Sequence, residues 1–320
     1  MQTRNSVSIY GCGGAGIDLV NRLLGQDLSG LAYVNAAFVD SSKSNFNGRY
    51  DPKTCYVLEG VDGSGKERSV NYPLIARAVD DVLLSHKPSD LNILVFSASG
   101  GTGSVFALKI AEALWAQNKA VLMFVVGSTE SGKTTGNTLD TIYSIDSMAR
   151  KQNVSSVMYY DTNGNNVRNA EVDLNMLMGM RWVLDLYSGT HHGLDSADVL
   201  NWARPSAGAK VNPQLCLLDI TEDRNEALEI ESPISVAELH GDDYRSEGTI
   251  PADYNAYGNR VEAGKGSIYF SIYTHGLDSL MGELKTIRED YDRRKASREK
   301  LTSSVMKNNN QSEDDGMFFS

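Results

Sequence analysis

The sequence SASGGTGS, residues 97–104, follows an apolar strand-like run, Asn92–Phe96, and precedes an apolar helical stretch, Val105–Ala116. Glycine lets the backbone approach a ligand closely, and the first N–H groups of the following helix favour an anion. A second loop of this kind, GCGGAG at residues 11–16, follows the expected strand Val7–Tyr10. Two such loops can present two sets of backbone N–H groups to one polyphosphate. The pair therefore predicts a nucleotide-binding protein.

The first half of the chain alternates apolar runs with amphipathic segments. This alternation is typical of an α/β protein with a mostly parallel sheet and helices on both faces. The expected strands after the first are 36–39, 92–96, 120–126 and 155–160, and the expected helices are 16–24, 72–84 and 105–116.

The pattern changes in the second half. One long helix is expected over 172–187, three strands of a smaller α+β unit over 214–220, 232–237 and 267–273, and a long charged amphipathic helix over 277–306. A polar, acidic segment ending in two aromatic residues follows and should be disordered in the free monomer. The predicted division is a nucleotide-binding domain at 1–170, a helix and acidic loop at 171–204, a second α+β domain at 205–276, a C-terminal helix at 277–306 and a tail at 307–320.

Composition excludes several classes of protein. The net charge of -11 disfavours nonspecific binding to nucleic acid or to an anionic membrane. The three cysteines, Cys12, Cys55 and Cys216, have no paired spacing, so they are expected to be reduced thiols of a cytoplasmic protein. The longest apolar run, 120–126, is too short to span a bilayer, and no leader sequence precedes the first strand.

The first glycine loop also supports a different interpretation. Gly11-x-Gly13-x-x-Gly16 matches the dinucleotide fingerprint, and Asp40 at a strand end can bind a ribose hydroxyl. An NAD-dependent oxidoreductase therefore remains an alternative, although it leaves residues 97–104 unexplained.

A third phosphate-binding pattern lies further along the chain. GSTESGKT at residues 127–134 is a formal P-loop match after a strand. Gly136 and Asn137 would fall in the first turns of the helix that a P-loop requires, and both earlier glycine loops would have no role. A P-loop NTPase is nevertheless retained as an alternative.

Two carboxylates follow the long central helix. In Leu194-Asp195-Ser196-Ala197-Asp198 the acids are three residues apart and share one face if the segment opens a helix. They can cap that helix, or they can polarise water for phosphate hydrolysis if a nucleotide lies nearby. His191 and His192 just before them have no partner cluster and are expected to be plain surface residues.

Three of these motifs resemble those of tubulin and FtsZ, in that family's order and rough spacing. They are the loop at 11–16 with Asn21-Arg22-Leu23 after it, the loop at 99–104 and the acidic stretch at 194–198. The short chain, long terminal helix and acidic tail look most like the tubulins of large bacteriophages. The resemblance implies a tubulin-like fold: a Rossmann-like GTP-binding domain, a central helix, a smaller α+β domain, a C-terminal helix and an acidic tail.

The resemblance also implies roles for individual residues. Asp195 and Asp198 would act in trans on the nucleotide of the neighbouring subunit, by positioning water. Glu130 would bind the ribose, and Asn163 and Asn175 would bind guanine. The residues implied to hold the phosphates are Gly11, Cys12, Gly13, Gly14, Ser99, Gly100, Gly101, Thr102, Gly103 and Ser104.

Some features depart from the family pattern. Glu171 stands where an aromatic usually stacks on guanine, and Gly193-Leu194 precedes the first acid in place of an asparagine-like residue. The metal ligands are unknown, with Asp40 and Asp62 as weak candidates for Mg²⁺.

The implied function is a GTPase that converts GTP to GDP and phosphate when it assembles head to tail with itself. The implied filament is a dynamic spindle that positions phage DNA in the host bacterial cytoplasm, without contacting nucleic acid or membrane. Asp314 and Asp315 would pair with basic residues of another subunit, while Met317, Phe318 and Phe319 enter an apolar groove. A scaffold of the same fold that does not hydrolyse GTP remains an alternative.

Overall fold

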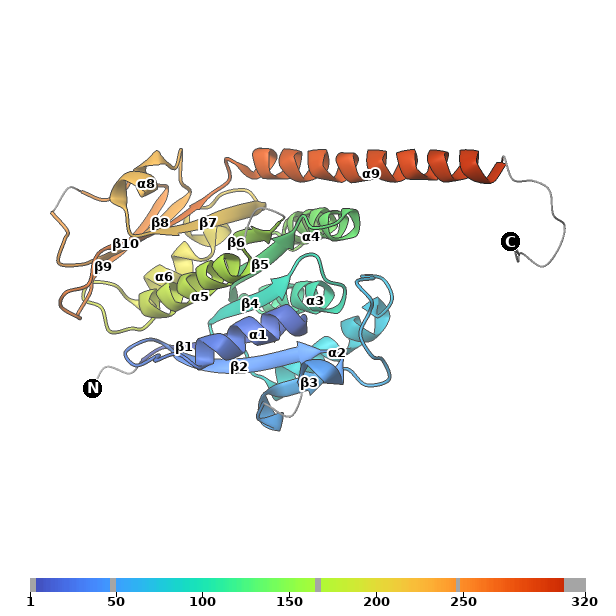
Figure 1. The fold of residues 1–320 in the computed structure, drawn as a ribbon. Helices are drawn as coiled ribbons and strands as arrows, with labels where there is room; N and C mark the ends of the chain where they lie inside the picture. Colours follow the sequence, from blue (N-terminus) through green and yellow to red (C-terminus); the bar gives the residue numbers. More distant parts are fainter. Residues whose placement is uncertain (1–3, 47–49, 165–167, 246–247, 308–320) are drawn as a thin grey trace.

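The computed structural model describes residues 4–46, 50–164, 168–245 and 248–307, with side chains up to residue 300. These residues form a ten-stranded sheet in the order β3-β2-β1-β4-β5-β6-β7-β10-β8-β9 (Figure 1). The strands are β1 (Ser6–Cys12), β2 (Tyr33–Asp40), β3 (Cys55–Val57), β4 (Leu91–Ser97), β5 (Ala120–Ser128), β6 (Ser156–Asn163), β7 (Leu215–Thr221), β8 (Ser235–His240), β9 (Tyr254–Asn259) and β10 (Ile268–Tyr273).

The sheet is parallel from β3 to β7, as the alternating pattern predicts. Strand β5 is buried along its whole length and β4 along nearly all of it, because helices cover both faces. Strands β1 and β4 are direct neighbours, with Gly11 opposite Val95. The two glycine loops that follow these strands must therefore emerge side by side at one edge of the sheet.

Helices pack on both faces of the sheet. On one face α1 and α5 pack together, and Arg22 pairs with Asp173 across them at 2.5 Å. On the other face α2, α3 and α4 share a second core, to which Leu284 of α9 contributes. The helices are α1 (Gly13–Leu24), α2 (Tyr72–Ser85), α3 (Thr102–Ala116), α4 (Gly132–Lys151), α5 (Asn169–Leu186), α6 (Ser196–Trp202), α7 (Pro205–Gly208), α8 (Arg224–Glu229) and α9 (Leu277–Lys307), with short 3₁₀ turns at Lys43–Asn45 and Pro52–Thr54.

The second half extends the same sheet. Strand β7 pairs in parallel with β6, and β10 then pairs antiparallel with both β7 and β8. The strands of the expected α+β unit are thus continuous with the nucleotide-binding half, and β9 was not predicted at all. The domain boundaries at 170, 204 and 276 stay predictions.

Helix α4 corrects an argument made from the sequence. Gly136 and Asn137 were held to disfavour a helix, yet both lie inside α4. A Cβ on Gly136 would lie 1.7 Å from Arg288 Nη1, so the glycine makes room for α9. The Asn137 amide donates hydrogen bonds to the carbonyls of Ser99, at 3.0 Å, and Lys66, at 2.9 Å. Packing against the C-terminal helix and the second glycine loop therefore explains residues that local propensity disfavours.

Helix α9 confirms the expected long C-terminal helix. Its first half packs along α4, and the remainder extends away from the sheet (Figure 1). Just before α4 begins, the Thr129 carbonyl accepts a hydrogen bond from the Tyr291 hydroxyl at 3.0 Å. A search of the described residues for a helix long and apolar enough to cross a membrane finds none.

Candidate nucleotide-binding site

The two glycine loops touch each other at the carboxyl edge of the sheet. A Cβ on Gly13 would lie 2.9 Å from the Gly103 Cα, and one on Gly103 would lie 2.5 Å from the Cys12 carbonyl oxygen. Gly13 also has a positive φ of 72°, which favours glycine. Gly16 approaches the Val95 carbonyl so closely that its Cβ would lie 2.0 Å away. The glycines therefore let α1, β4 and both loops converge.

Both loops open directly into helices whose first N–H groups lack a side-chain cap. Within the described residues, the Cys12 side chain makes no capping hydrogen bond at the start of α1, and the cap position of α3 is Gly101, which has no side chain to offer. Gly14 is exposed at the first turn of α1. Two neighbouring uncapped helix starts can satisfy their N–H groups with the oxygens of one anion.

The second loop is held by residues that the sequence did not single out. Ser64 and Glu67 lie against Gly101, where a Cβ would be 2.0 Å from the Ser64 hydroxyl. The Ser104 hydroxyl donates inward to the carbonyls of Gly100 and Gly101, at 3.0 and 3.1 Å. The Ser104 side chain therefore shapes the loop instead of facing a ligand.

Cys12 contributes its backbone and not its thiol. Its side chain is 1% exposed in the core beneath the loop. Burial raises the pKa of this thiol above its usual range, and the nearby Asp40 carboxylate raises it further.

Asp40 does not fit the role of a magnesium ligand. Its Oδ1 accepts hydrogen bonds from the backbone N–H groups of Ser41 and Ser42, and its Oδ2 accepts one from the Asn45 amide. Burial raises the pKa of this carboxyl, which favours its neutral form. Asp62 is exposed and accepts a hydrogen bond from Ser42. Within the described ranges no three His, Cys, Asp or Glu side chains converge on a possible metal site.

The residues expected at the ribose and base lie at the ends of β5 and β6. Glu130 is exposed two residues after β5, and its carboxylate accepts a hydrogen bond from Ser128 at 3.2 Å. Asn163 ends β6 beside Ser128, and its buried Oδ1 accepts no hydrogen bond from any residue that the structure describes. Asn175 lies in the second turn of α5, half-buried, and donates to Asp161 at 2.9 Å. All three residues share the edge of the sheet that carries the glycine loops.

The P-loop match has a geometry of its own. Ser131 caps α4 by accepting a hydrogen bond from Thr134 N, and the Thr134 hydroxyl accepts one from Ser131 N. The ammonium of Lys133 binds Glu67 at 2.5 Å and the Gly65 carbonyl at 3.2 Å. The helix start and the lysine that a P-loop offers to phosphate are thus both engaged, which argues against that alternative.

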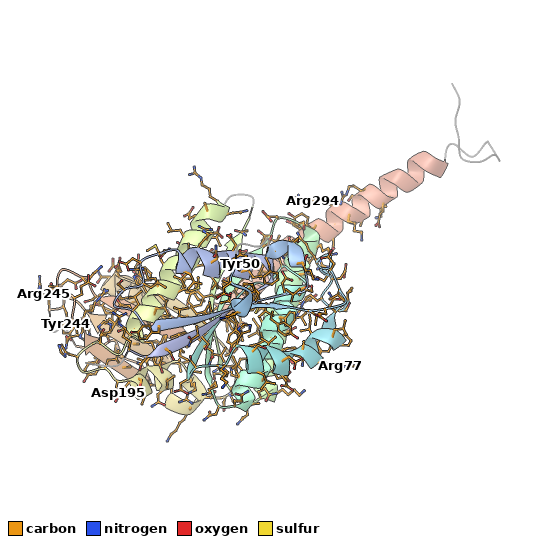
Figure 2. All side chains as sticks on the ribbon, turned by 90° about the horizontal axis from the view of Figure 1, so that it is seen from below. Tyr50, Arg77, Asp195, Tyr244, Arg245 and Arg294 are labelled. Carbon is orange, nitrogen blue, oxygen red and sulfur yellow. The ribbon has the colours of Figure 1, made fainter. Side chains whose placement is uncertain are left out.

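The acidic pair lies at the opposite end of the molecule. Helix α5 starts beside the glycine loops and spans about 27 Å at 1.5 Å per residue, carrying the chain to the far edge of the sheet. Figure 2 shows Asp195 at the end away from Arg294 of the projecting helix α9. Asp195 is exposed and caps α6 by accepting a hydrogen bond from Asp198 N at 2.9 Å. Asp198 accepts one from the hydroxyl of Tyr254, a residue that the sequence did not indicate.

The loop before Asp195 is braced by a buried polar network. Asp185 binds Arg260 Nη2 at 2.5 Å and His191 Nε2 at 3.1 Å, and all three side chains are at most 13% exposed. The expectation that His191 is a plain surface residue is therefore wrong, whereas His192 is exposed as expected. Backbone bonds between His192 and Asn259, at 2.8 and 3.0 Å, tie the loop to the end of β9. The partner of His191 is Asp185 of α5, a contact between residues six apart that no local sequence pattern indicated.

The residues expected to contact a neighbouring subunit, Asp314, Asp315, Met317, Phe318 and Phe319, lie outside the described residues.

Comparison with known proteins finds similarity to phage tubulin-like proteins. A family model for the C-terminal domain of phage tubulin-like proteins matches residues 194–256, a region in which only the acidic stretch had suggested the family. Phage tubulin-like proteins of Pseudomonas phages PhiPA3 and phiKZ are 27% identical over 290 residues and 24% identical over 319 residues. These matches cover 89% of this chain and 90% of the PhiPA3 protein, and 95% of this chain and 96% of the phiKZ protein.

Solved structures agree with these relatives. A protofilament of TubZ from bacteriophage PhiKZ has a TM-score of 0.84 at 23% identity, over 98% of this chain and 96% of that chain. The phage tubulin PhuZ with GDP has a TM-score of 0.82 at 24% identity, over 91% and 92% of the two chains. FtsZ from M. jannaschii has a TM-score of 0.63 at 14% identity, over 85% and 92%.

The expected α/β fold is thus confirmed as tubulin-like, since the solved structures of phage tubulins and of FtsZ share it. The resemblance to the phage tubulins, of which PhuZ is one, is confirmed as well.

Proposed function

We propose that this protein is a phage tubulin: a GTPase that assembles head to tail and hydrolyses GTP between successive subunits. One observation carries the proposal. The two glycine loops, after β1 and β4, and the exposed Asp195, at the start of α6, lie at opposite ends of the sheet (Figure 1). Stacking subunits end to end would bring the acid of one subunit against the nucleotide of the next, whereas no subunit can apply Asp195 to its own nucleotide.

The chemistry assigned to this interface is phosphoryl transfer to water. It needs positioning and charge stabilisation more than covalent catalysis. Backbone N–H groups of the two loops would bind the phosphate oxygens and hold the terminal phosphate in line. Asp195 would orient the attacking water, and Asp198, held by Tyr254, would support it from within the loop. Mg²⁺ would arrive with the nucleotide, bound mainly by phosphate oxygens and water.

The C-terminal tail would strengthen the filament. A cavity of about 480 Å³ between α2, α3 and α4 is lined by apolar side chains such as Val105, Leu108 and Met148. Arg68, Lys109 and Lys151 also line it, and Lys109 pairs with Glu112, another lining residue, at 2.5 Å. These features match a segment with two acids followed by Met317, Phe318 and Phe319. We assign this cavity as the receiving surface for the tail of another subunit, in a contact that salt should weaken.

The cellular role that we propose follows from the resemblance to the tubulins of large bacteriophages. The filament would work in the host bacterial cytoplasm as a dynamic spindle that positions phage DNA without touching it. The chain's net charge of -11 supports the absence of direct DNA contact.

Complementation between two inactive variants tests the shared site. Asp195→Asn keeps an N-cap and an intact nucleotide site but loses the acid. Gly14→Asp places a carboxylate at the exposed start of α1, where it suits the helix dipole but repels phosphate. Each variant alone should lack GTP turnover, and their mixture should recover it. If both variants sediment in the same filaments without turnover, the shared site is refuted.

A further inference from the structure

We infer that Asp161 sets the base preference of the nucleotide site by fixing the side-chain amide of Asn175 as a hydrogen-bond acceptor. This inference rests on the proposed function, since it assumes that Asn175 faces the base. Asp161 belongs to neither glycine loop nor to the residues that the family resemblance assigns to the nucleotide.

The contact joins β6 to the second turn of α5, near the residues expected to bind the base. Asp161 Oδ2 accepts a hydrogen bond from Asn175 Nδ2 at 2.9 Å. The other oxygen, Oδ1, accepts one from the backbone N–H of Thr162 at 2.7 Å. Asp161 lies in β6 and Asn175 in α5, so the bond also links the strand to the helix.

The chemistry of the pair determines which way the amide points. An ionised carboxylate can only accept hydrogen bonds, so the Asn175 NH₂ group must face Asp161. The orientation of an asparagine amide is often ambiguous from shape alone, but a carboxylate partner removes that ambiguity. Asn175 Oδ1 therefore points elsewhere as an acceptor, and it has no hydrogen-bond partner within the described part of the chain.

An acceptor at this place discriminates between purines. Guanine carries donors at N1–H and at its 2-amino group, whereas adenine has an acceptor at N1 and no 2-amino group. A fixed acceptor pairs with the guanine donors but opposes the lone pair of adenine N1, and a mismatched polar contact of this kind costs affinity. We assign Asp161 as a positioning residue, because its carboxylate binds the Asn175 amide and the Thr162 backbone, and Asn175 is the residue expected to contact the base.

Substitution Asp161→Asn tests this directly. Asparagine at 161 is nearly isosteric but can donate or accept, so the Asn175 amide becomes free to turn. We expect the ratio of ADP to GDP dissociation constants to fall at least tenfold, measured by calorimetry on monomer below the assembly concentration. The matched control is Asp173→Asn, which removes a neighbouring α5 carboxylate that pairs with Arg22 and should leave the ratio unchanged.

Two further measurements separate the possible outcomes. Asn175→Ala should lower the same ratio, and adding Asp161→Asn to it should lower the ratio no further, because the two residues act as one unit. An unchanged ratio in Asp161→Asn overturns the inference. If wild type binds GDP and ADP equally, only this inference fails; if it binds neither, the proposed function fails with it.

Discussion

At the scale of single residues, Asp195 combines two roles that can be separated. Its carboxylate caps α6, and it is the group proposed to act on the next subunit's nucleotide. Alanine would remove both roles, and the lost cap alone costs about 1 kcal/mol. Asparagine is an equally good cap without the charge.

We therefore expect Asp195→Asn to keep the wild-type melting temperature and to assemble with GTP, while its turnover falls by about 10²–10⁴-fold. Phosphate release and sedimentation on the same sample measure both properties. Wild-type turnover in this variant would remove Asp195 from the mechanism.

Cys12 gives a prediction about pH. Because burial raises the pKa of its thiol, the fold favours the neutral form. That contribution to stability is fully present below the unfolded pKa of about 8.5 and is lost as the pH rises toward the folded value.

We expect the free energy of unfolding to fall as the pH rises above about 8.5, and Cys12→Ala to reduce this slope by up to about 1.4 kcal/mol per pH unit. Urea unfolding between pH 7 and 10 measures the slope. GDP affinity should stay within about twofold of wild type, because the residue offers the ligand only its backbone. Cys55→Ala, at a partly exposed thiol, is the control and should change the slope less.

At the scale of elements, the fit between the two glycine loops is the critical feature. A Cβ on Gly103 would meet the Cys12 carbonyl at 2.5 Å, and backbone cannot move aside cheaply. On Gly100 in the same loop, the nearest atom would be 3.6 Å away.

Gly103→Ala should therefore destabilise the fold by about 1–3 kcal/mol and weaken GDP binding, whereas Gly100→Ala should leave the melting temperature unchanged. Thermal unfolding with and without GDP compares the two. Equal melting temperatures would show that the loops do not depend on this close contact.

The buried network behind the acidic loop is a second element-scale feature. Arg260→Met leaves the Asp185 carboxylate in a poorly hydrated site without its arginine partner, which should lower the free energy of unfolding by about 3–5 kcal/mol. The matched control, Lys265→Met, breaks an exposed pair with Glu262 at 3.8 Å and should cost less than about 1 kcal/mol. Chemical denaturation measures both, and similar losses would contradict the bracing role of Asp185.

The sequence predicted the elements unevenly, for physical reasons. Strands β4 and β5 were found because burial on both faces leaves long apolar runs, and β1 was found because Val7, Ile9 and Tyr10 directly precede a glycine loop. Helix α4 was missed because its unfavourable residues are explained by distant partners. Gly136 packs against α9, and Asn137 donates a hydrogen bond to the second glycine loop. Strand β9 exposes alternate residues at the sheet edge, so its apolar signal is weak.

At the scale of the whole molecule, the sequence indicated the composition of the site better than its geometry. The glycine loops and the acidic stretch could be named because each has a local pattern. Asp161, Tyr254 and Arg260 could not, because each matters through a partner on another element. The continuity of the sheet through β7 also depends on pairing that no local pattern specifies.

The tail is predicted to matter only in the assembled state. Deleting residues 312–320 should leave monomer stability and GDP affinity unchanged but raise the critical concentration or block assembly. Lys151→Glu reverses the charge of a residue that lines the cavity between α2, α3 and α4, and it should have the same effect. Light scattering at increasing protein and salt concentrations measures both variants, and normal filaments from the truncated chain would disprove the tail contact.

The central claim is that the hydrolytic site is completed only between subunits. The most direct measurement is GTP hydrolysis per subunit as a function of protein concentration, with light scattering recorded in parallel. We predict specific activity near zero at low concentration, rising together with scattering above a threshold. Specific activity that stays constant with concentration would mean that one chain holds the complete site, and would contradict this account.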